Sequence, residues 1–224
     1  MGSRQIQIWT HGFERCKSLN EDKDSTMVVS SWQLLSGALL LSCLASFGWA
    51  MRKFFVQPAG ITTGMRVTKA CGIAFAIQHF VAILVTHGIS QDRGAAGVFL
   101  YLSSLGLFWW AIKTTSKHPL SAVASPDIPA HLVEKGPYRF IRHPLYFSYL
   151  LTWFAGVIAT GRWWLIPSVA VMAVIYFNAA SREERKFAGS PLAGAYREYQ
   201  SRTGLFVPNP VKLLSARRFK TSAG

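Results

Sequence analysis

The chain has 224 residues, of which 50% are hydrophobic and only 15% charged, and its mean hydropathy is +0.24. Because a soluble domain usually carries about a quarter charged residues, this composition argues against an ordinary soluble fold. The formal net charge of +14 would suit a nucleic-acid partner, but membrane topology explains it without one, as the distribution of the charges indicates.

Five long runs without a charged residue account for the composition. A helix needs roughly 20 mostly apolar residues to cross the hydrocarbon core of a bilayer. A soluble helix of that length would show a polar face. The runs therefore predict an all-α, polytopic membrane bundle of about five transmembrane helices with a C-terminal helical tail. Their bounds are Ser25–Met51, Ala70–Gln91, Gly94–Ile112, His143–Gly161 and Trp163–Ser181.

The first three runs are expected to form one membrane unit, residues 32–112, behind a polar N-terminal tail of residues 1–31. The second run carries His79 and His87. A short turn around Asp92-Arg93-Gly94 should join the second run to the third.

Residues 113–224 are expected to hold a long loop, a hairpin of the last two spans and a polar, basic tail. The loop contains "SPDIP", which favours turns and extended backbone. Only Thr160-Gly161-Arg162 joins the last two runs, so their far ends must lie side by side, roughly 8–10 Å apart. In the tail, "LAGAYREYQSR" predicts a helix.

The basic residues are divided unequally between the two sides of the membrane. With five spans, the side that holds the C-terminus carries 18 Lys and Arg and the other carries 6. The positive-inside rule therefore places the C-terminus in the cytoplasm, at a bacterial inner membrane or the endoplasmic reticulum. The same distribution explains the positive net charge by the orientation of the chain in the bilayer, so no nucleic-acid partner is expected.

Metal chemistry is not indicated. The three cysteines are scattered and predict neither a disulfide framework nor a zinc site, and His118 and His131 lack the spacing of metal ligands.

Two polar clusters should meet where the last hairpin reaches the cytoplasm. Taken singly, their arginines suit the flank of any membrane helix, but two adjacent glutamates do little for orientation. The clusters are therefore interpreted as a candidate site. The first comprises Tyr138, Arg139, Arg142, His143 and Tyr146, and the second Asn178, Arg182, Glu183 and Glu184.

Three stretches carry a resemblance to a known family: "LVEKGPYRFIRHPLYFSYLL", "SREERKF" and "AYREYQSRTGLFVP". Together they resemble the isoprenylcysteine carboxyl methyltransferase superfamily, which includes phospholipid N-methyltransferases. The resemblance covers residues 130–210. It implies S-adenosylmethionine as the methyl donor, held at the cytoplasmic ends of the last two spans under the C-terminal tail. One departure from the family pattern, the proline-containing "FAGSPLAGAYREY", leaves the acceptor open.

The chemistry of this donor matches the residues of the motifs. Its carboxylate needs a fixed cation, for which Arg142 and His143 are candidates. Its sulfonium favours an aromatic face or a carboxylate, which Tyr146 and Glu183 or Glu184 could supply.

The adenine of the donor is expected to stack on Tyr138, with the backbone of Leu132 and Val133 at its edge. Gly136, which begins the Gly-Pro-Tyr-Arg motif, completes the predicted cofactor-binding residues.

Methyl transfer is an in-line displacement, so catalysis should rest on positioning and desolvation. By the resemblance, Arg182 is expected to hold an anionic acceptor such as a carboxylate. For an amine acceptor, Glu183 or Glu184 would be the base. Asn178 is expected to face the bundle and could orient either acceptor.

The sequence thus predicts an integral-membrane methyltransferase that uses S-adenosylmethionine and acts on a lipophilic acceptor from the bilayer. The first expectation for the acceptor is the carboxylate of an isoprenylated cysteine, and the alternative is the amine of a phospholipid or another small lipid.

The rival hypothesis is a non-enzymatic membrane protein or a transporter subunit. A transporter should show charges or broken helices near the middle of the membrane, and only His79, His87 and Asn178 come close.

Overall fold

The computed structural model describes residues 30–56, 63–116, 120–121 and 131–209. The polar N-terminal tail up to residue 29 and the "SPDIP" stretch of the loop lie outside these residues.

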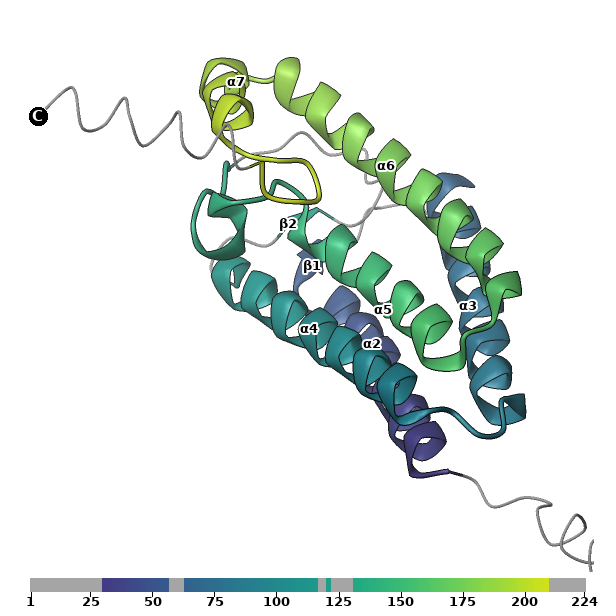
Figure 1. Ribbon diagram of the computed structural model, residues 1–224. Coiled ribbons are helices and arrows are strands. Elements are labelled where there is room, and N and C mark those ends of the chain that lie inside the picture. Colours follow the sequence, from purple (N-terminus) through teal and green to yellow (C-terminus); the bar gives the residue numbers. More distant parts are fainter. Residues whose placement is uncertain (1–29, 57–62, 117–119, 122–130, 210–224) are drawn as a thin grey trace, which may run out of the picture.

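Five apolar helices build the bundle (Figure 1). Four of them are long and apolar enough to cross a membrane: α2 Ser31–Lys53, α3 Thr63–Val85, α4 Gln91–Thr115, and α6 Ile166–Ala188 with the preceding 3-10 turn η2 Trp163–Leu165. The fifth, α5 Pro144–Thr160, is apolar and 17 residues long. This confirms the predicted all-α membrane bundle.

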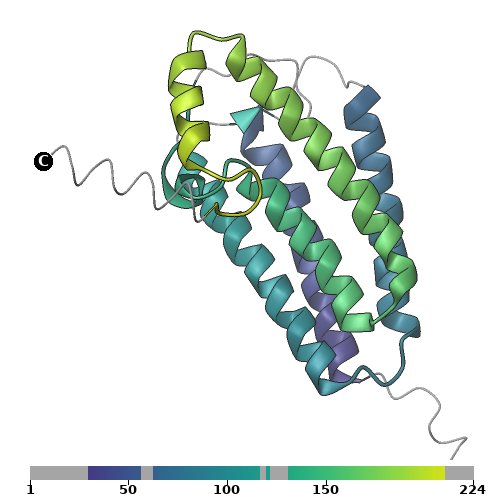
Figure 2. The ribbon, with the colours of Figure 1, turned by 45° about the horizontal axis from the view of Figure 1, so that its top comes forward.

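Smaller elements gather at one end of the bundle, near the C-terminus. They are the 3-10 turn η1 Gly136–Arg139, the helix α7 Ala193–Arg202, and the two-residue strands β1 Phe55–Val56 and β2 Leu120–Ser121, which pair in parallel. Figure 2 shows α7 beside the ends of α4 and α6, and we call this the α7 end of the bundle. The helix predicted in "LAGAYREYQSR" is thereby confirmed.

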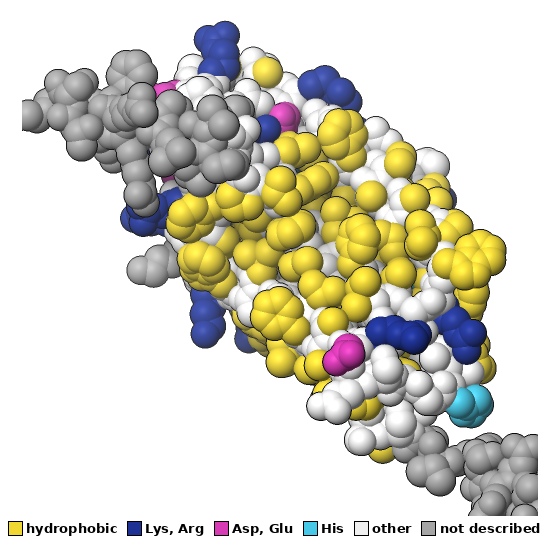
Figure 3. Space-filling model, in the orientation of Figure 1, with side chains coloured by type: hydrophobic (Ala, Val, Ile, Leu, Met, Phe, Trp, Pro, Cys, Tyr) yellow, Lys and Arg dark blue, Asp and Glu magenta, His cyan; other side chains and the backbone are white. Residues whose placement is uncertain are grey.

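The surface of the bundle is apolar along its length. Large side chains such as Leu34, Ile77, Phe99 and Val174 are at least half exposed. Figure 3 shows the apolar surface as a broad band, with charged side chains toward its two ends. A soluble protein rarely exposes so large a continuous patch, whereas a bilayer requires one.

Local sequence fixes the helix ends. Ser30 and Gln33 form a capping box at the start of α2. Pro144 stands in the first turn of α5, where the missing N–H costs nothing. Gly161 ends α5 with a φ of 65°, which favours glycine. Pro167 stands in the first turn of α6, so it interrupts no internal hydrogen bond.

The predicted second span was placed too late in the chain. Helix α3 takes in Arg66 and Lys69 at its start and ends at Val85, because charged side chains are tolerated where a helix leaves the membrane. His87 therefore lies outside the helix, in a connection that includes Gly88 with a φ of 65°. The turn predicted at Asp92-Arg93-Gly94 is wrong, since these residues form the first turn of α4.

Helices α4 and α5 lie closely side by side. Gly97 faces Ala159, and a Cβ added to the glycine would lie 2.5 Å from the Cβ of that alanine. Ser104 donates a hydrogen bond to the backbone oxygen of Ser148 (2.7 Å), and its hydroxyl is 2.8 Å from that of Thr152. Small residues and interhelical hydrogen bonds of this kind are the usual means of packing helices in lipid.

A buried histidine joins α3 to α6. His79 is fully buried, and its Nε2 lies 2.9 Å from the hydroxyl of Ser168. Because that hydroxyl donates its own hydrogen to Leu165 O, the Nε2–H must be the donor. His79 thus links the two helices inside the bundle through a buried hydrogen bond.

We expect Gly97→Ala to destabilise the protein, because the added methyl group would push α4 away from α5. Overpacking of this kind costs roughly 1–3 kcal/mol, measured as a lower midpoint of thermal unfolding in detergent. Gly106→Ala is the matched control, since a Cβ there meets nothing within 4 Å. The control should keep or raise the midpoint, and equal midpoints for both variants would contradict the close packing.

Candidate functional site

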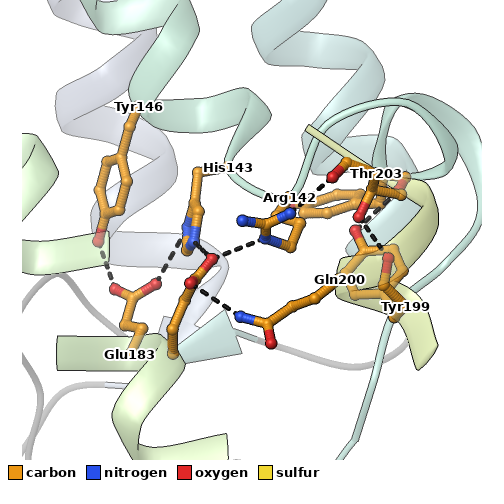
Figure 4. Close-up of polar contacts among 9 residues, drawn as sticks. Arg142, His143, Tyr146, Glu183, Tyr199, Gln200 and Thr203 are labelled. Carbon is orange, nitrogen blue, oxygen red and sulfur yellow. Dashed lines mark hydrogen bonds and ion pairs between the residues drawn. The ribbon is translucent and has the colours of Figure 1, made fainter. Parts of the chain in front are cut away.

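The predicted site residues lie at the α7 end of the bundle. The end of η1 and the start of α5 bring Arg142, His143 and Tyr146 from one side, and the last turns of α6 bring Glu183 and Glu184 from the other (Figure 4). We call these five residues the polar cluster.

Direct contacts join α5 to α6 within the polar cluster. The hydroxyl of Tyr146 donates a hydrogen bond to Glu183 Oε1. About two turns before Glu183 on α6, the ring of Tyr176 stacks on that of Tyr146, with centroids 5.6 Å apart and planes 7° from parallel. The expectation that the far ends of the last two spans lie side by side is confirmed.

Glu184 is held by several partners. It accepts hydrogen bonds from Arg142 Nε at 2.6 Å and from Gln200 Nε2 at 2.9 Å. Arg142 also donates from Nη1 to the backbone oxygen of Thr203 (2.7 Å), and its side chain is only 11% exposed. Glu184 therefore anchors α7 and the residues after it to the start of α5.

Residues 203–206, which we call the strap, lie along residues 140–143. The N–H groups of Arg142 and His143 donate to Gly204 O (2.9 Å) and Leu205 O (3.1 Å), and Gly204 N–H donates to Phe140 O (3.1 Å). A Cβ at Gly204 would lie 1.8 Å from Val207 O, so the turn requires glycine. The strap therefore lies against Arg142 and His143, and the ring of Phe206 has its centroid 6.1 Å from that of His143.

His143 stands between the two glutamates. Its Nδ1 is 3.5 Å from Glu183 Oε2 and its Nε2 is 3.5 Å from Glu184 Oε1. Nε2 is buried and forms no hydrogen bond within the described part of the chain. Burial lowers the pKa of His143, but the contacts with both glutamates and their negative charge outweigh this effect, so the pKa is raised above 6.5.

Tyr138 lies beneath the strap, in the same core cluster as Tyr146 and Tyr176. Its residue is 6% exposed, and its backbone oxygen accepts a hydrogen bond from the hydroxyl of Tyr199 (2.7 Å). Its own hydroxyl has no hydrogen-bond partner among the described residues. Burial raises the pKa of Tyr138, and the nearby Tyr199, Tyr149 and Glu183 add to the rise, so the phenol stays neutral.

Gly136 gives η1 its position against α4. It has a φ of 56°, and a Cβ there would lie 2.2 Å from Thr114 Oγ1. Leu132 and Val133 precede it and are partly buried, and Val133 packs against the main core.

Three exposed residues of the predicted clusters do not join the polar cluster. Arg139 is the first of them. Arg182 is exposed and takes no part in the hydrogen bonds or ion pairs within the described residues. Asn178 is also exposed, so the expectation that it faces the bundle is wrong.

Sequence reasoning missed the residues of α7 and the strap that hold the polar cluster. The buried positions Tyr196, Tyr199 and Thr203 are spaced by three and four, as on one helix face, which was a readable signal. The ion pair between Arg202 and Glu134 (2.6 Å) joins segments 68 residues apart and has no such signal.

Comparison with known families finds a match that covers part of the chain. Residues 93–190 match the phospholipid methyltransferase family. The matched segment runs from the first turn of α4 to just beyond α6 and contains the whole polar cluster. The match confirms the superfamily resemblance carried by the motifs and supports an integral-membrane methyltransferase. A search of curated proteins finds no match.

The raised pKa of His143 predicts that the protein loses stability as the pH rises. A histidine that binds its proton more tightly in the folded state contributes stability below 6.5, and loses it as the pH passes the raised pKa. We expect the midpoint of thermal unfolding to fall over that range.

In His143→Gln this fall should be absent. His87→Gln, which removes an exposed histidine outside the helices, should keep the wild-type profile. A fall of equal size in both variants would show that another group is responsible.

Proposed function

We propose that the protein transfers a methyl group from S-adenosylmethionine to the amine of a phospholipid head group. The unequal partners of Glu183 and Glu184 carry the proposal. The carboxylate of Glu184 accepts hydrogen bonds from Arg142 and Gln200. That of Glu183 is 30% exposed and can accept further hydrogen bonds beside the aromatic core. A site with one available carboxylate at the membrane end of a helix suits a basic acceptor.

The polar cluster has groups left over that fit the donor. A guanidinium carries five N–H groups, and Arg142 uses its Nε and Nη1 in bonds to Glu184 and Thr203. The remaining N–H groups of Arg142 suit the carboxylate of the amino-acid part of the donor. These buried, incompletely satisfied groups are what a site for a charged ligand requires.

When bound, the donor supplies an electrophilic methyl group on a positively charged sulfur. Glu183 would take the proton of the acceptor amine, which would free the nitrogen lone pair to accept the methyl group. Tyr146 holds the Glu183 carboxylate in place through its hydrogen bond. The side chains of Arg142 and His143 are only 11% and 9% exposed, and the scarcity of water strengthens their interactions.

The orientation and division of the chain follow from the same proposal. The donor is water-soluble, so the α7 end faces the cytoplasm, in agreement with the excess of basic residues on that side. Residues 32–112 then form the lipid-facing wall, residues 113–224 carry the donor site, and the acceptor comes from the bilayer.

An isoprenylated cysteine carboxylate stays a prediction with less support. It depended on a cation at Arg182, and that side chain is exposed outside the polar cluster. A carboxylate would also meet the negative charge of Glu183.

Binding and turnover in detergent test the proposal. We expect calorimetry to detect S-adenosylhomocysteine binding. We also expect transfer of labelled methyl groups to phosphatidylethanolamine in mixed micelles. Glu183→Gln should lower kcat by roughly 10²–10⁴-fold, as loss of a general base does. Its affinity for S-adenosylhomocysteine should equal that of the wild type.

Two further variants separate the alternatives. Glu184→Gln should weaken S-adenosylhomocysteine binding and lower thermal stability, since it releases Arg142 and Gln200. Arg182→Ala should leave methylation of the amine unchanged. Absence of S-adenosylhomocysteine binding by the wild-type protein would overturn the enzyme proposal, and methylation of a prenylated cysteine that depends on Arg182 would overturn the amine acceptor.

A further inference from the structure

Two exposed arginines lie at the end of the bundle away from α7, and we call Arg93 and Arg162 the arginine pair. Arg93 belongs to the first turn of α4, and Arg162 stands in the connection between α5 and α6. The side chain of Arg93 extends over that connection, since a Cβ added to Gly161 would lie 2.5 Å from Arg93 Nη1. Residues far apart in sequence thus bring two cations to one turn.

Neutral groups hold the arginine pair in place. Arg162 Nε donates a hydrogen bond to the hydroxyl of Thr86 (3.0 Å), and the backbone N–H of Arg162 donates to that of Thr160 (3.3 Å). Neither arginine forms an ion pair with a described residue. A guanidinium carries five N–H groups, so most of the donors of the pair stay open.

The positive charge at this end is unusual and is not neutralised by the neighbouring chain. Among residues 30–40, 80–99 and 155–170, which build this end, the arginine pair provides every Lys or Arg side chain, and Asp92 is the single carboxylate. The first turn of a helix disfavours a cation, because its free N–H groups carry partial positive charge. The end therefore keeps an excess positive charge that suits an anion.

The surroundings of the arginine pair are those of a membrane interface. Trp163 and Trp164 follow Arg162 directly and are 77% and 36% exposed. Tryptophan is enriched at the level of the lipid head groups. Figure 3 shows basic side chains at the edge of the apolar band at this end. The anion that a bilayer offers at this depth is the phosphate of a phospholipid, and guanidinium groups bind phosphate with favourable geometry.

We propose that the arginine pair binds the phosphate of an anionic phospholipid in the leaflet opposite to the α7 end. The excess positive charge favours a head group with net negative charge over a zwitterionic one. The bound lipid joins the start of α4 to the connection between α5 and α6, and Arg162 extends the link to Thr86, just after α3. This lipid site is separate from the polar cluster and independent of the proposed function.

Competition between two lipids tests the proposal. Phosphatidylglycerol and phosphatidylcholine are added in equal amounts to the detergent-purified full chain, and the bound lipid is identified by native mass spectrometry. We expect the wild-type protein to retain one phosphatidylglycerol in preference to phosphatidylcholine. Arg93→Gln with Arg162→Gln should lower this preference roughly tenfold, the loss typical of hydrogen bonds to a charged group.

Thermal unfolding gives a second measurement that does not depend on how stable the variant is. Phosphatidylglycerol should raise the midpoint of the wild-type protein by roughly 2–4 °C, and that of the double variant should not change, each compared with its own midpoint without lipid. Arg93→Gln alone breaks no hydrogen bond between described residues. Its midpoint without lipid should therefore equal that of the wild type, and its rise with lipid should be smaller.

Arg66→Gln with Arg185→Gln is the matched control. Both residues are exposed arginines at the α7 end, in the first turn of α3 and the last turn of α6, so the same charge is removed from the other end of the bundle. This variant should keep the preference for phosphatidylglycerol and the rise in midpoint.

Three results would overturn the lipid site. The first is a wild-type protein without preference for phosphatidylglycerol, as expected if the acids of residues 1–29 neutralise the arginine pair instead. The second is an equal loss of preference in the control variant, and the third is an equal rise in midpoint with inorganic phosphate alone. None of these bears on the proposed function, which S-adenosylhomocysteine binding tests separately.

Discussion

The short connection between α5 and α6 is the constraint on which the site depends. Gly161 ends α5 in a left-handed conformation, and η2 leads directly into α6, so the two helices must run back along each other. Tyr146 and Glu183, 37 residues apart in sequence, therefore meet. Because α5 is 17 residues long and α6 is 23, the last turn of α6 extends past the start of its neighbour and carries the chain over to α7.

Two adjacent glutamates gain different surroundings from the geometry of one helix. Successive residues of an α-helix point about 100° apart. On α6 this directs Glu183 toward Tyr146 of α5 and Glu184 toward Arg142 and Gln200. The sequence shows only the pair, and the neighbouring helices decide which carboxylate is structurally engaged and which stays available.

Much of the fold was predictable because lipid leaves few choices. An uncharged run of membrane length must be a helix, and the three-residue connection made the last hairpin certain. The exact ends of the helices were less predictable. Helix α3 begins before the uncharged run and includes Arg66 and Lys69. Asn178 was misplaced for another reason: Tyr176, Ala179, Ala180 and Glu183 follow a helical period that defines the inward face, and Asn178 falls outside it.

The contacts of the strap could not have been predicted, although the family resemblance implied a site under the C-terminal tail. These contacts are backbone hydrogen bonds between Gly204 or Leu205 and residues 140–143, and backbone groups carry no sequence signal. Only Gly204, which no other residue can replace in its turn, hints at the close approach. The sequence indicates that titratable side chains cluster at this end of the bundle. It does not show how far they are buried, which decides the dielectric constant around them.

The exposure of the two carboxylates also bears on turnover. Methylation of an amine releases one proton each time, and a fully enclosed base would hold it and stop after one reaction. Glu183 is 30% exposed and Glu184 19%, with His143 within 3.5 Å of both. In the proposed reaction, a proton taken up at Glu183 can thus reach water directly or through the imidazole, while the Tyr146 side of the same carboxylate stays in the apolar core. Glu183, at the edge of the site, can therefore act as a base beside the apolar core and also release its proton to water. A glutamate one turn deeper could not do both.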